Sequence, residues 1–228
     1  MMYFDPLYLI ITLPALLLGM WAQWLVKSRI TEMHQIPNQL GITGQETAQR
    51  ILDANGIADV QIEEVAGFLS DHYSPGEKVL RLSPEIYSGR SVSSLAVAAH
   101  EVGHAIQHKN AYAPLALRSV IAPAAAFGSN AAMILIMAGS FLNVAGLFKI
   151  ACVVFAISVF FTLVTLPVEF DASWRALKQI ETLHLSGGDE WYKARKVLTA
   201  AAMTYVAAAV AAMLQLLYFV MLANRRRN

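Results

Sequence analysis

Charged residues and cysteine are scarce in this 228-residue sequence. Only 14% of its residues are Asp, Glu, Lys or Arg and 57% are hydrophobic, whereas soluble domains usually carry about 25% charged residues. The shortage of charge indicates a membrane protein. The single Cys152 excludes an intrachain disulfide, and we interpret it as a packed apolar side chain. The net charge of +1 gives no reason to expect nucleic-acid binding.

Four apolar runs have about the twenty residues that a helix needs to cross hydrocarbon. They cover residues 7–26, 119–139, 147–168 and 198–222. Trp21 and Trp24 lie near the end of the first run, as interface anchors do. We expect this first run to be retained, because no basic segment precedes it and no small-residue cleavage site follows it. The second and third runs predict a tight transmembrane hairpin.

The region between the first two runs has a soluble composition. Thr43 and Glu46 are spaced as a capping box, which predicts a helix through Ala54 that ends at Gly56. Alternating apolar residues then predict short strands at residues 60–65, 67–69 and 79–82. A small sheet is therefore expected before the next helix, and an edge strand of it could hold an extended peptide.

Residues 97–109 contain an HExxH motif formed by His100, Glu101 and His104. Serines at positions 91, 93 and 94 can cap a helix here, and Asn110 with Pro114 marks its end. On a helix, residues four apart lie on one face, so both imidazoles can reach one metal ion with Glu101 beside it. The motif can also occur by accident on an ordinary amphipathic helix, and the helical context favours the metal site.

Zinc is the metal that this motif favours. Bound zinc lowers the pKa of its water to roughly 7, and a neighbouring carboxylate can take the proton as the water attacks a carbonyl. The implied chemistry is hydrolysis of an amide bond by Glu101 as general base. Gly103 inside the motif costs about 1 kcal/mol relative to alanine, so we expect another backbone to approach closely there.

A catalytic zinc usually has three protein ligands. His108 is not the third, because eight residues of helix place it about 12 Å from His100. A membrane hairpin returns the chain to the face that it left, so Glu169, the first charged residue after the third run, can come back to the motif. Pro167 suits the first turn of a new helix here. Asp171 is the rival ligand or an acceptor for a ligand imidazole, and Glu169 could instead be a helix-end carboxylate.

Three separated blocks resemble a known family. DHYSPGEKVLRLSPEIYSGRS, AVAAHEVGHAIQH and LPVEFDASWRAL are similar to the bacterial membrane-embedded neutral zinc metallopeptidases, and more remotely to the heat-shock membrane protease and prenyl-protein protease group. The resemblance covers nearly the whole chain. It implies zinc ligands at His100, His104 and Glu169, with Glu101 as catalytic base. The remote group has an aspartate four residues after the ligand glutamate, where this chain has Ser173.

The oxyanion of the reaction needs a donor besides the metal. Candidates on the expected side are His72, Tyr73, Tyr87 and Arg175, and the sequence does not choose among them. For each of these side chains an ordinary loop or surface role is the simpler interpretation.

We expect a multi-pass protein of the cell membrane with its catalytic side in the cytoplasm. Most basic residues near the ends of the runs fall on that side, although Arg225, Arg226 and Arg227 fall on the other. The expected partners are the lipid bilayer and protein or peptide substrates, mainly membrane-associated ones. The oligomeric state is not predicted.

Three other functions fit part of the pattern. An intramembrane protease would need a longer apolar segment around the motif. A metal transporter would need more polar groups in the spans than Asn130, Lys149 and Gln215. A non-proteolytic membrane protein with a structural zinc would leave Glu101 unexplained.

The predicted fold is a mainly α membrane protein with four transmembrane helices and a small α+β catalytic region of the zincin type. We expect a first transmembrane helix in residues 1–29, a soluble catalytic region in 30–112 and a transmembrane hairpin in 113–168. The third-ligand helix region would follow in 169–196, and a fourth transmembrane helix with a basic tail in 197–228.

Overall fold

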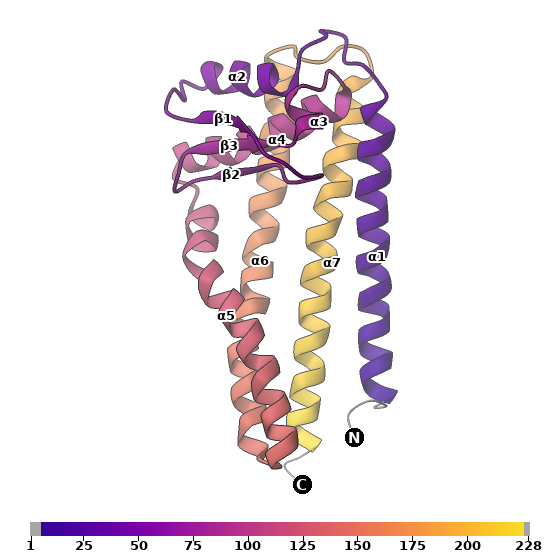
Figure 1. The fold of residues 1–228 in the computed structure, drawn as a ribbon, viewed down its shortest axis with the longest axis vertical. Coiled ribbons are helices and arrows are strands. Elements are labelled where there is room, and N and C mark those ends of the chain that lie inside the picture. The colour runs from indigo at the N-terminus through magenta and orange to yellow at the C-terminus, as the bar shows by residue number, and fades with distance from the viewer. Residues whose placement is uncertain (1–5, 226–228) are drawn as a thin grey trace. The chain divides into compact units, whose positions relative to one another are not determined.

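The computed structural model describes residues 6–225, so Arg226 and Arg227 of the basic tail lie outside the described residues. Within this range the chain forms seven helices and one three-stranded sheet (Figure 1). The elements in chain order are α1 Pro6–His34, α2 Gly44–Ala54, β1 Gln61–Glu64, β2 His72–Ser74, β3 Val79–Leu82, α3 Pro84–Tyr87, α4 Val92–Lys109, α5 Ala113–Leu142, α6 Ala145–Thr182 and α7 Glu190–Arg225.

Two compact units divide the chain, and the long helices run from one into the other. One unit, called the span unit, comprises residues 6–22, 116–167 and 204–225 of the described chain. The other, called the site unit, comprises residues 23–115 and 168–203. The site unit contains the whole sheet and α2, α3 and α4.

Four helices are long and apolar enough to cross a membrane: α1, α5, α6 and α7. This confirms the mainly α membrane fold with four spans. In the span unit, α5, α6 and α7 pack through a buried apolar cluster that includes Ile136, Phe148, Phe155 and Phe219. The Ser158 hydroxyl donates to the carbonyl oxygen of Ala125 across the hairpin at 2.8 Å, which satisfies a polar group that lipid could not.

The third span and the segment after it form one continuous helix. A new helix beginning at Pro167 was expected, but α6 continues through this residue to Thr182. Proline removes one backbone hydrogen bond, and apolar helices tolerate this loss when the surrounding helix is otherwise intact. Glu169 therefore lies two residues after Pro167 within the same helix.

The small sheet lies in the order β1-β3-β2, with β1 parallel and β2 antiparallel to β3. This confirms a small α+β region. The capping box of Thr43 and Glu46 is also confirmed at the start of α2. The predicted strand at residues 67–69 is wrong, because Gly67 and Leu69 have φ angles of 120° and 58° and cannot continue an extended strand. The second strand along the chain, β2, begins instead at His72.

The core of the site unit surrounds α4. Its fully buried members include Ile51 and Leu52 from α2, Leu80 and Leu82 from β3, and Leu95 from α4. Because α2, the sheet and α6 all pack on this core, almost every side chain of α4 is buried, including polar ones. Each buried polar side chain of α4 therefore needs a hydrogen-bond partner.

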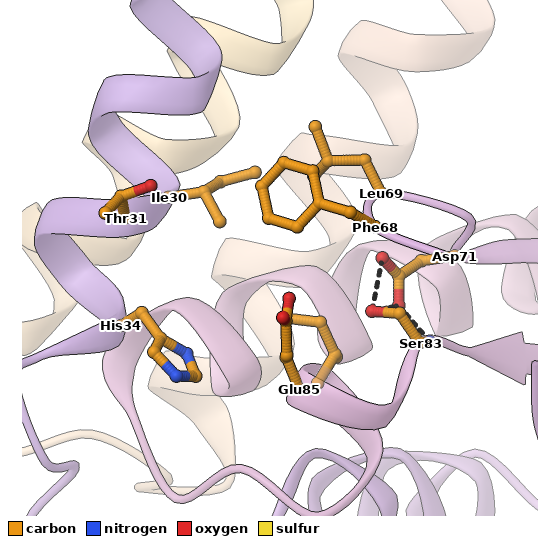
Figure 2. Close-up of a pocket in the computed structure, with 9 residues that line it drawn as sticks. Ile30, Thr31, His34, Phe68, Leu69, Asp71, Ser83 and Glu85 are labelled. Atoms are coloured by element: carbon orange, nitrogen blue, oxygen red, sulfur yellow. Dashed lines mark hydrogen bonds between the residues drawn. The ribbon is translucent and has the colours of Figure 1, made fainter. Parts of the chain in front are cut away.

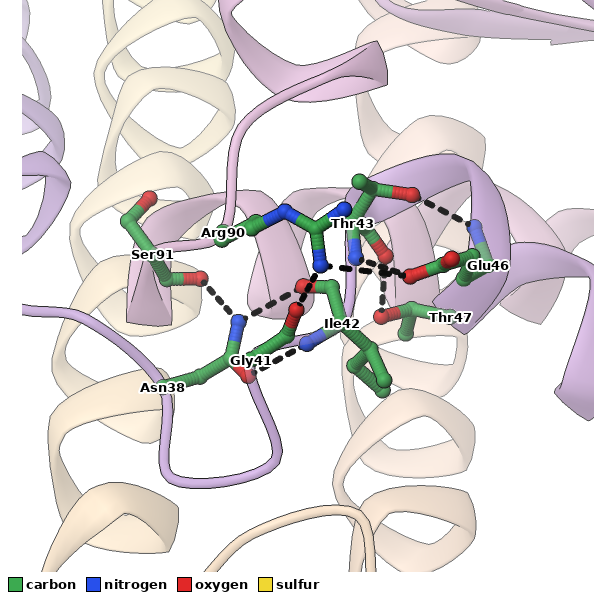
Figure 3. A network of polar contacts seen from close by, with 8 residues as sticks. All are labelled: Asn38, Gly41, Ile42, Thr43, Glu46, Thr47, Arg90 and Ser91. Atoms are coloured by element: carbon green, nitrogen blue, oxygen red, sulfur yellow. Dashed lines mark hydrogen bonds and ion pairs between the residues drawn. The ribbon is translucent and has the colours of Figure 1, made fainter.

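Asn38 holds together the loop that follows α1 (Figure 3). Its amide nitrogen donates to the carbonyl oxygens of Ile42 at 2.8 Å and of Ser91 at 3.4 Å. Its amide oxygen accepts from the backbone nitrogen of Ile42 at 3.1 Å. Since Ser91 is the N-cap of α4, this buried amide joins the loop to the start of the motif helix.

We expect Asn38→Ala to lower the free energy of unfolding by about 2–4 kcal/mol, because two buried backbone groups of Ile42 would lose their partner. Denaturant unfolding of the detergent-purified protein measures this change. Asn110→Ala at an exposed helix end is the matched control and should change stability by less than about 0.5 kcal/mol. Equal stability of the Asn38 variant and the wild type would contradict this structural role.

Candidate metal centre

The motif helix α4 begins at a serine cap, as predicted. The Ser91 hydroxyl accepts from the backbone nitrogen of Ser94 at 3.1 Å, and the helix ends at Lys109 before the Asn110 C-cap. His100 and His104 lie one turn apart, with their ring centroids 4.9 Å from each other. The HExxH residues are therefore on a regular, well-capped helix.

The structure brings Glu169 from α6 to these two histidines. Its Oε2 atom lies 3.3 Å from Nε2 of His100 and 3.6 Å from Nε2 of His104. The side chain of Glu169 is only 2% exposed, and one ligand atom from each of the three residues lies within 4.8 Å of the others. Asp171, the rival ligand, is not part of this group.

The three donors fit zinc. Tetrahedral zinc with ligands at about 2.1 Å requires any two ligand atoms to be about 3.4 Å apart, close to the two separations that Oε2 of Glu169 makes with the imidazoles. Two imidazole nitrogens and one carboxylate are also a set that catalytic zinc uses. We therefore regard zinc as the metal that this cluster could hold.

A glycine allows the two helices to meet this closely. A Cβ atom at Gly103 would lie 2.5 Å from the carbonyl oxygen of Ala172 on α6. Ala172 lies three residues after Glu169. The same turn of α6 therefore carries the Glu169 carboxylate and packs against α4 at Gly103. The expected close approach of another backbone at Gly103 is confirmed.

Glu101 lies inside the same buried region and is 7% exposed. Burial raises the pKa of its carboxyl, against the lowering effect of His100 and His104. For His104, burial acts to lower the pKa, but the hydrogen bond to Glu169 and the charge of Glu101 outweigh it and raise the pKa. A carboxyl with a raised pKa holds a proton more readily than an ordinary carboxylate does, which suits a group that must take a proton from water.

Gln107 connects His104 to α6 and is a functional residue that was not predicted from the sequence. Its Oε1 atom lies 3.0 Å from Nδ1 of His104, so the imidazole can donate to it. Its Nε2 atom donates to the carbonyl oxygen of Val168 at 2.7 Å and to Asp171 at 2.8 Å. Asp171 also accepts from Arg175 at 2.5 Å. Asp171 therefore supports the imidazole through Gln107 rather than directly.

Ser173 contacts the other imidazole. Its hydroxyl oxygen lies 3.2 Å from Nδ1 of His100, while Nε2 of the same ring lies 3.3 Å from Oε2 of Glu169. A signal for both supporting residues is present in the sequence: Gln107 lies three residues after His104, and Ser173 four residues after Glu169.

The other predicted residues are distributed around the site unit. His72 is exposed, with Nδ1 at 2.8 Å from the carbonyl oxygen of Ser70, and Tyr87 packs against the core. The Tyr73 hydroxyl lies 2.9 Å from Nδ1 of His108, one turn beyond the motif. Burial raises the pKa of Tyr73 to about 12, so at neutral pH this hydroxyl keeps its proton.

A cavity of about 160 Å³ lies beside the loop before β2 (Figure 2). Phe68 and Leu69 line it together with residues from the end of α1, and Asp71 accepts from the backbone nitrogen of Ser83 at 2.7 Å. Burial raises the pKa of Asp71, against the lowering effect of the Ser83 hydrogen bonds. The negative charge of Asp71 also contributes to the raised pKa of Glu101, because two carboxylates repel each other.

These observations define a class: a membrane protein with four spans and a buried cluster of two histidines and a glutamate built on an HExxH helix. The chain belongs to the family described as "Putative neutral zinc metallopeptidase", whose profile matches residues 8–224. A relative from Bacillus subtilis (strain 168), described as "Putative membrane protease YugP", is 46% identical over 222 residues, covering 97% of this chain and 99% of the relative. No solved structure matches the chain.

We expect Gly103→Ala to weaken zinc binding by at least about tenfold, because the added methyl group would push α6 and its Glu169 away from the imidazoles. Competition with a zinc-sensitive dye measures the affinity. Gly19→Ala, a helical glycine with open space around it, is the control and should bind zinc like the wild type. Unchanged affinity in Gly103→Ala would refute the close-packing argument.

We expect Gln107→Leu to reduce zinc affinity by about 10- to 100-fold, as loss of a group that orients a ligand imidazole usually does. Gln49→Leu removes an exposed glutamine on α2 and should leave the affinity unchanged. The same dye competition compares the two variants. A loss of equal size in both would mean that Gln107 acts only through general stability.

Proposed function

We propose that this protein is a membrane-bound zinc endopeptidase that hydrolyses peptide bonds of membrane or membrane-proximal proteins. The observation that carries the proposal is the buried cluster of His100, His104 and Glu169 with Glu101 beside it. The membership in a family described as metallopeptidases supports the same reaction class. A structural zinc or a transport site would not require an additional buried carboxyl next to the ligands.

Each side chain has a proposed role. His100, His104 and Glu169 would hold the ion through two Nε2 atoms and one carboxylate oxygen. Zinc bound there supplies Lewis acidity toward a coordinated water and the substrate carbonyl. Glu101 would take the proton from the attacking water and pass it to the leaving amine, which its raised pKa favours.

Supporting groups would fix the ligands. Ser173 would accept from Nδ1 of His100, and Gln107 from Nδ1 of His104, so that both Nε2 lone pairs face the ion. Asp171 and Arg175 form an ion pair behind Gln107. Arg175 is thereby engaged in orienting the site, which makes it less available to stabilise an oxyanion.

The sheet offers a means of holding a substrate backbone. Strand β2 is an edge strand, paired only with β3 in the described chain, and it packs against α4. An extended peptide added to this edge would bind through backbone hydrogen bonds with little dependence on sequence. The short distance along α6 from the third span to Glu169 favours substrates that emerge from the bilayer.

We also propose the cell membrane as the location, with the site on the cytoplasmic side. Residues near the span ends on that side carry most of the cations. These residues are Lys27, Arg29, Lys109, Arg118, Arg175, Lys178, Lys193, Arg195 and Lys196.

The test compares zinc content and casein cleavage in detergent-purified wild type, Glu101→Gln and Glu169→Ala. We expect Glu101→Gln to keep about one zinc per chain and to lose at least about 100-fold in activity, as expected when a general base is removed. Glu169→Ala should lose zinc, because two histidines alone bind it weakly. A chelator should abolish the wild-type activity, and added zinc should restore it.

Two results would contradict the proposal. Cleavage that survives in Glu101→Gln would remove the proposed base, and full zinc occupancy in Glu169→Ala would remove the third ligand. Zinc uptake into liposomes that survives Glu101→Gln would favour a transporter instead.

A further inference from the structure

A second and larger cavity, of about 390 Å³, lies between α1 and α7 in the site unit. Leu25 and Arg29 line it from α1. Tyr192, Arg195, Lys196, Thr199 and Ala200 line it from α7. None of these residues belongs to the metal centre, and the proposed peptidase reaction makes no use of them.

The lining residues lie on one face of each helix. Leu25 and Arg29 are four residues apart, and the α7 residues recur at intervals of three and four. Residues at these intervals are neighbours on a helix surface. The cavity is therefore formed by two facing helical stripes on rigid elements rather than by loops.

Three cations from two helices converge on this cavity, and none of its lining residues is acidic. Arg29 is paired with Glu32 at 2.7 Å. Within residues 6–225, Arg195 and Lys196 form no ion pair, and the guanidinium of Arg195 lies 5.8 Å from the ring centre of Trp191. The nearby Lys193 is neutralised by Asp189 at 3.0 Å. The cavity thus keeps a net positive charge.

The cations also lie at the expected edge of the bilayer. The first apolar run ends at Val26, three residues before Arg29, and the fourth begins at Leu198, two residues after Lys196. Leu25 and Ala200 lie inside these runs, one helical turn from Arg29 and Lys196 respectively. The exposed Trp24 beside Leu25 suits an interfacial position. The cavity is therefore polar at its outer half and apolar toward the hydrocarbon.

We propose that this cavity binds an anionic phospholipid, with the phosphate between Arg29, Arg195 and Lys196 and the start of an acyl chain along Leu25 and Ala200. Tyr192 and Thr199 add hydroxyl groups to the lining of the same cavity. Basic pockets between helices at the membrane boundary suit such lipids. A free phosphate would match the cations but leave the apolar half without a partner. The lipid site does not depend on the peptidase activity.

The test is a titration of phosphatidylglycerol into detergent-purified protein, followed by native mass spectrometry. We expect Arg195→Gln/Lys196→Gln to bind this lipid about 30-fold more weakly than the wild type, since each membrane-surface cation contributes about fivefold. Phosphatidylcholine, which has no net charge, should bind the wild type about as weakly as phosphatidylglycerol binds the variant.

The matched control is Lys27→Gln/Lys178→Gln, which removes two exposed cations near the same boundary but outside the cavity. It should bind phosphatidylglycerol like the wild type. Circular dichroism in lipid-free detergent checks that both double variants are folded. Equal loss in the control, equal binding of phosphatidylcholine, or displacement of the lipid by millimolar inorganic phosphate would overturn the proposal. Zinc content is measured alongside and should be unchanged in both variants.

Discussion

The close contact between α4 and α6 is the constraint on which the candidate metal centre depends. At Gly103 the two backbones are so near that a methyl group would collide with the carbonyl oxygen of Ala172. This glycine lies between the two histidines in sequence, and Ala172 lies one turn after Glu169. The contact therefore sets the distance between ligands that are far apart in the chain. A glycine weakens an isolated helix, but here it permits a geometry that no larger residue would allow.

The same contact creates an electrostatic problem that a metal ion resolves. Two carboxyls and two imidazoles are buried or nearly buried in one place, and burial of ionised groups is costly unless they are paired or bound to a cation. The surrounding hydrogen bonds from Gln107 and Ser173 hold the imidazoles in one orientation. A cluster arranged in this way is suited to a divalent cation and would be difficult to explain as ordinary core packing.

The positions of the charged residues along the chain also follow from the cost of burying unpaired charge in an apolar environment. The chain is poor in charge overall, yet cations gather at the ends of the spans and three of them converge on the cavity between α1 and α7. Apolar helices fix the protein in the bilayer, and the cations at the boundary provide complementary charge for anionic headgroups. The helices of the site unit thus continue in sequence into the apolar runs, and these cations lie close to the ends of those runs in the sequence.

The sequence by itself determined the four spans, the capped α2, the motif helix and the small sheet, because hydropathy, caps and periodicity are local properties. It also predicted that another backbone would approach Gly103. It misplaced the strand at residues 67–69, where left-handed backbone angles prevent an extended chain, and it predicted a helix start at Pro167 where α6 continues.

Only the tertiary structure decided that Glu169 rather than Asp171 joins the histidines. It also decided that Gln107 and Ser173 face the Nδ1 atoms of His104 and His100. The cavity between α1 and α7 likewise depends on two segments more than 160 residues apart. Apart from the contact of Gln107 with His104 inside α4, these features depend on how segments distant in sequence pack together, which no local pattern encodes.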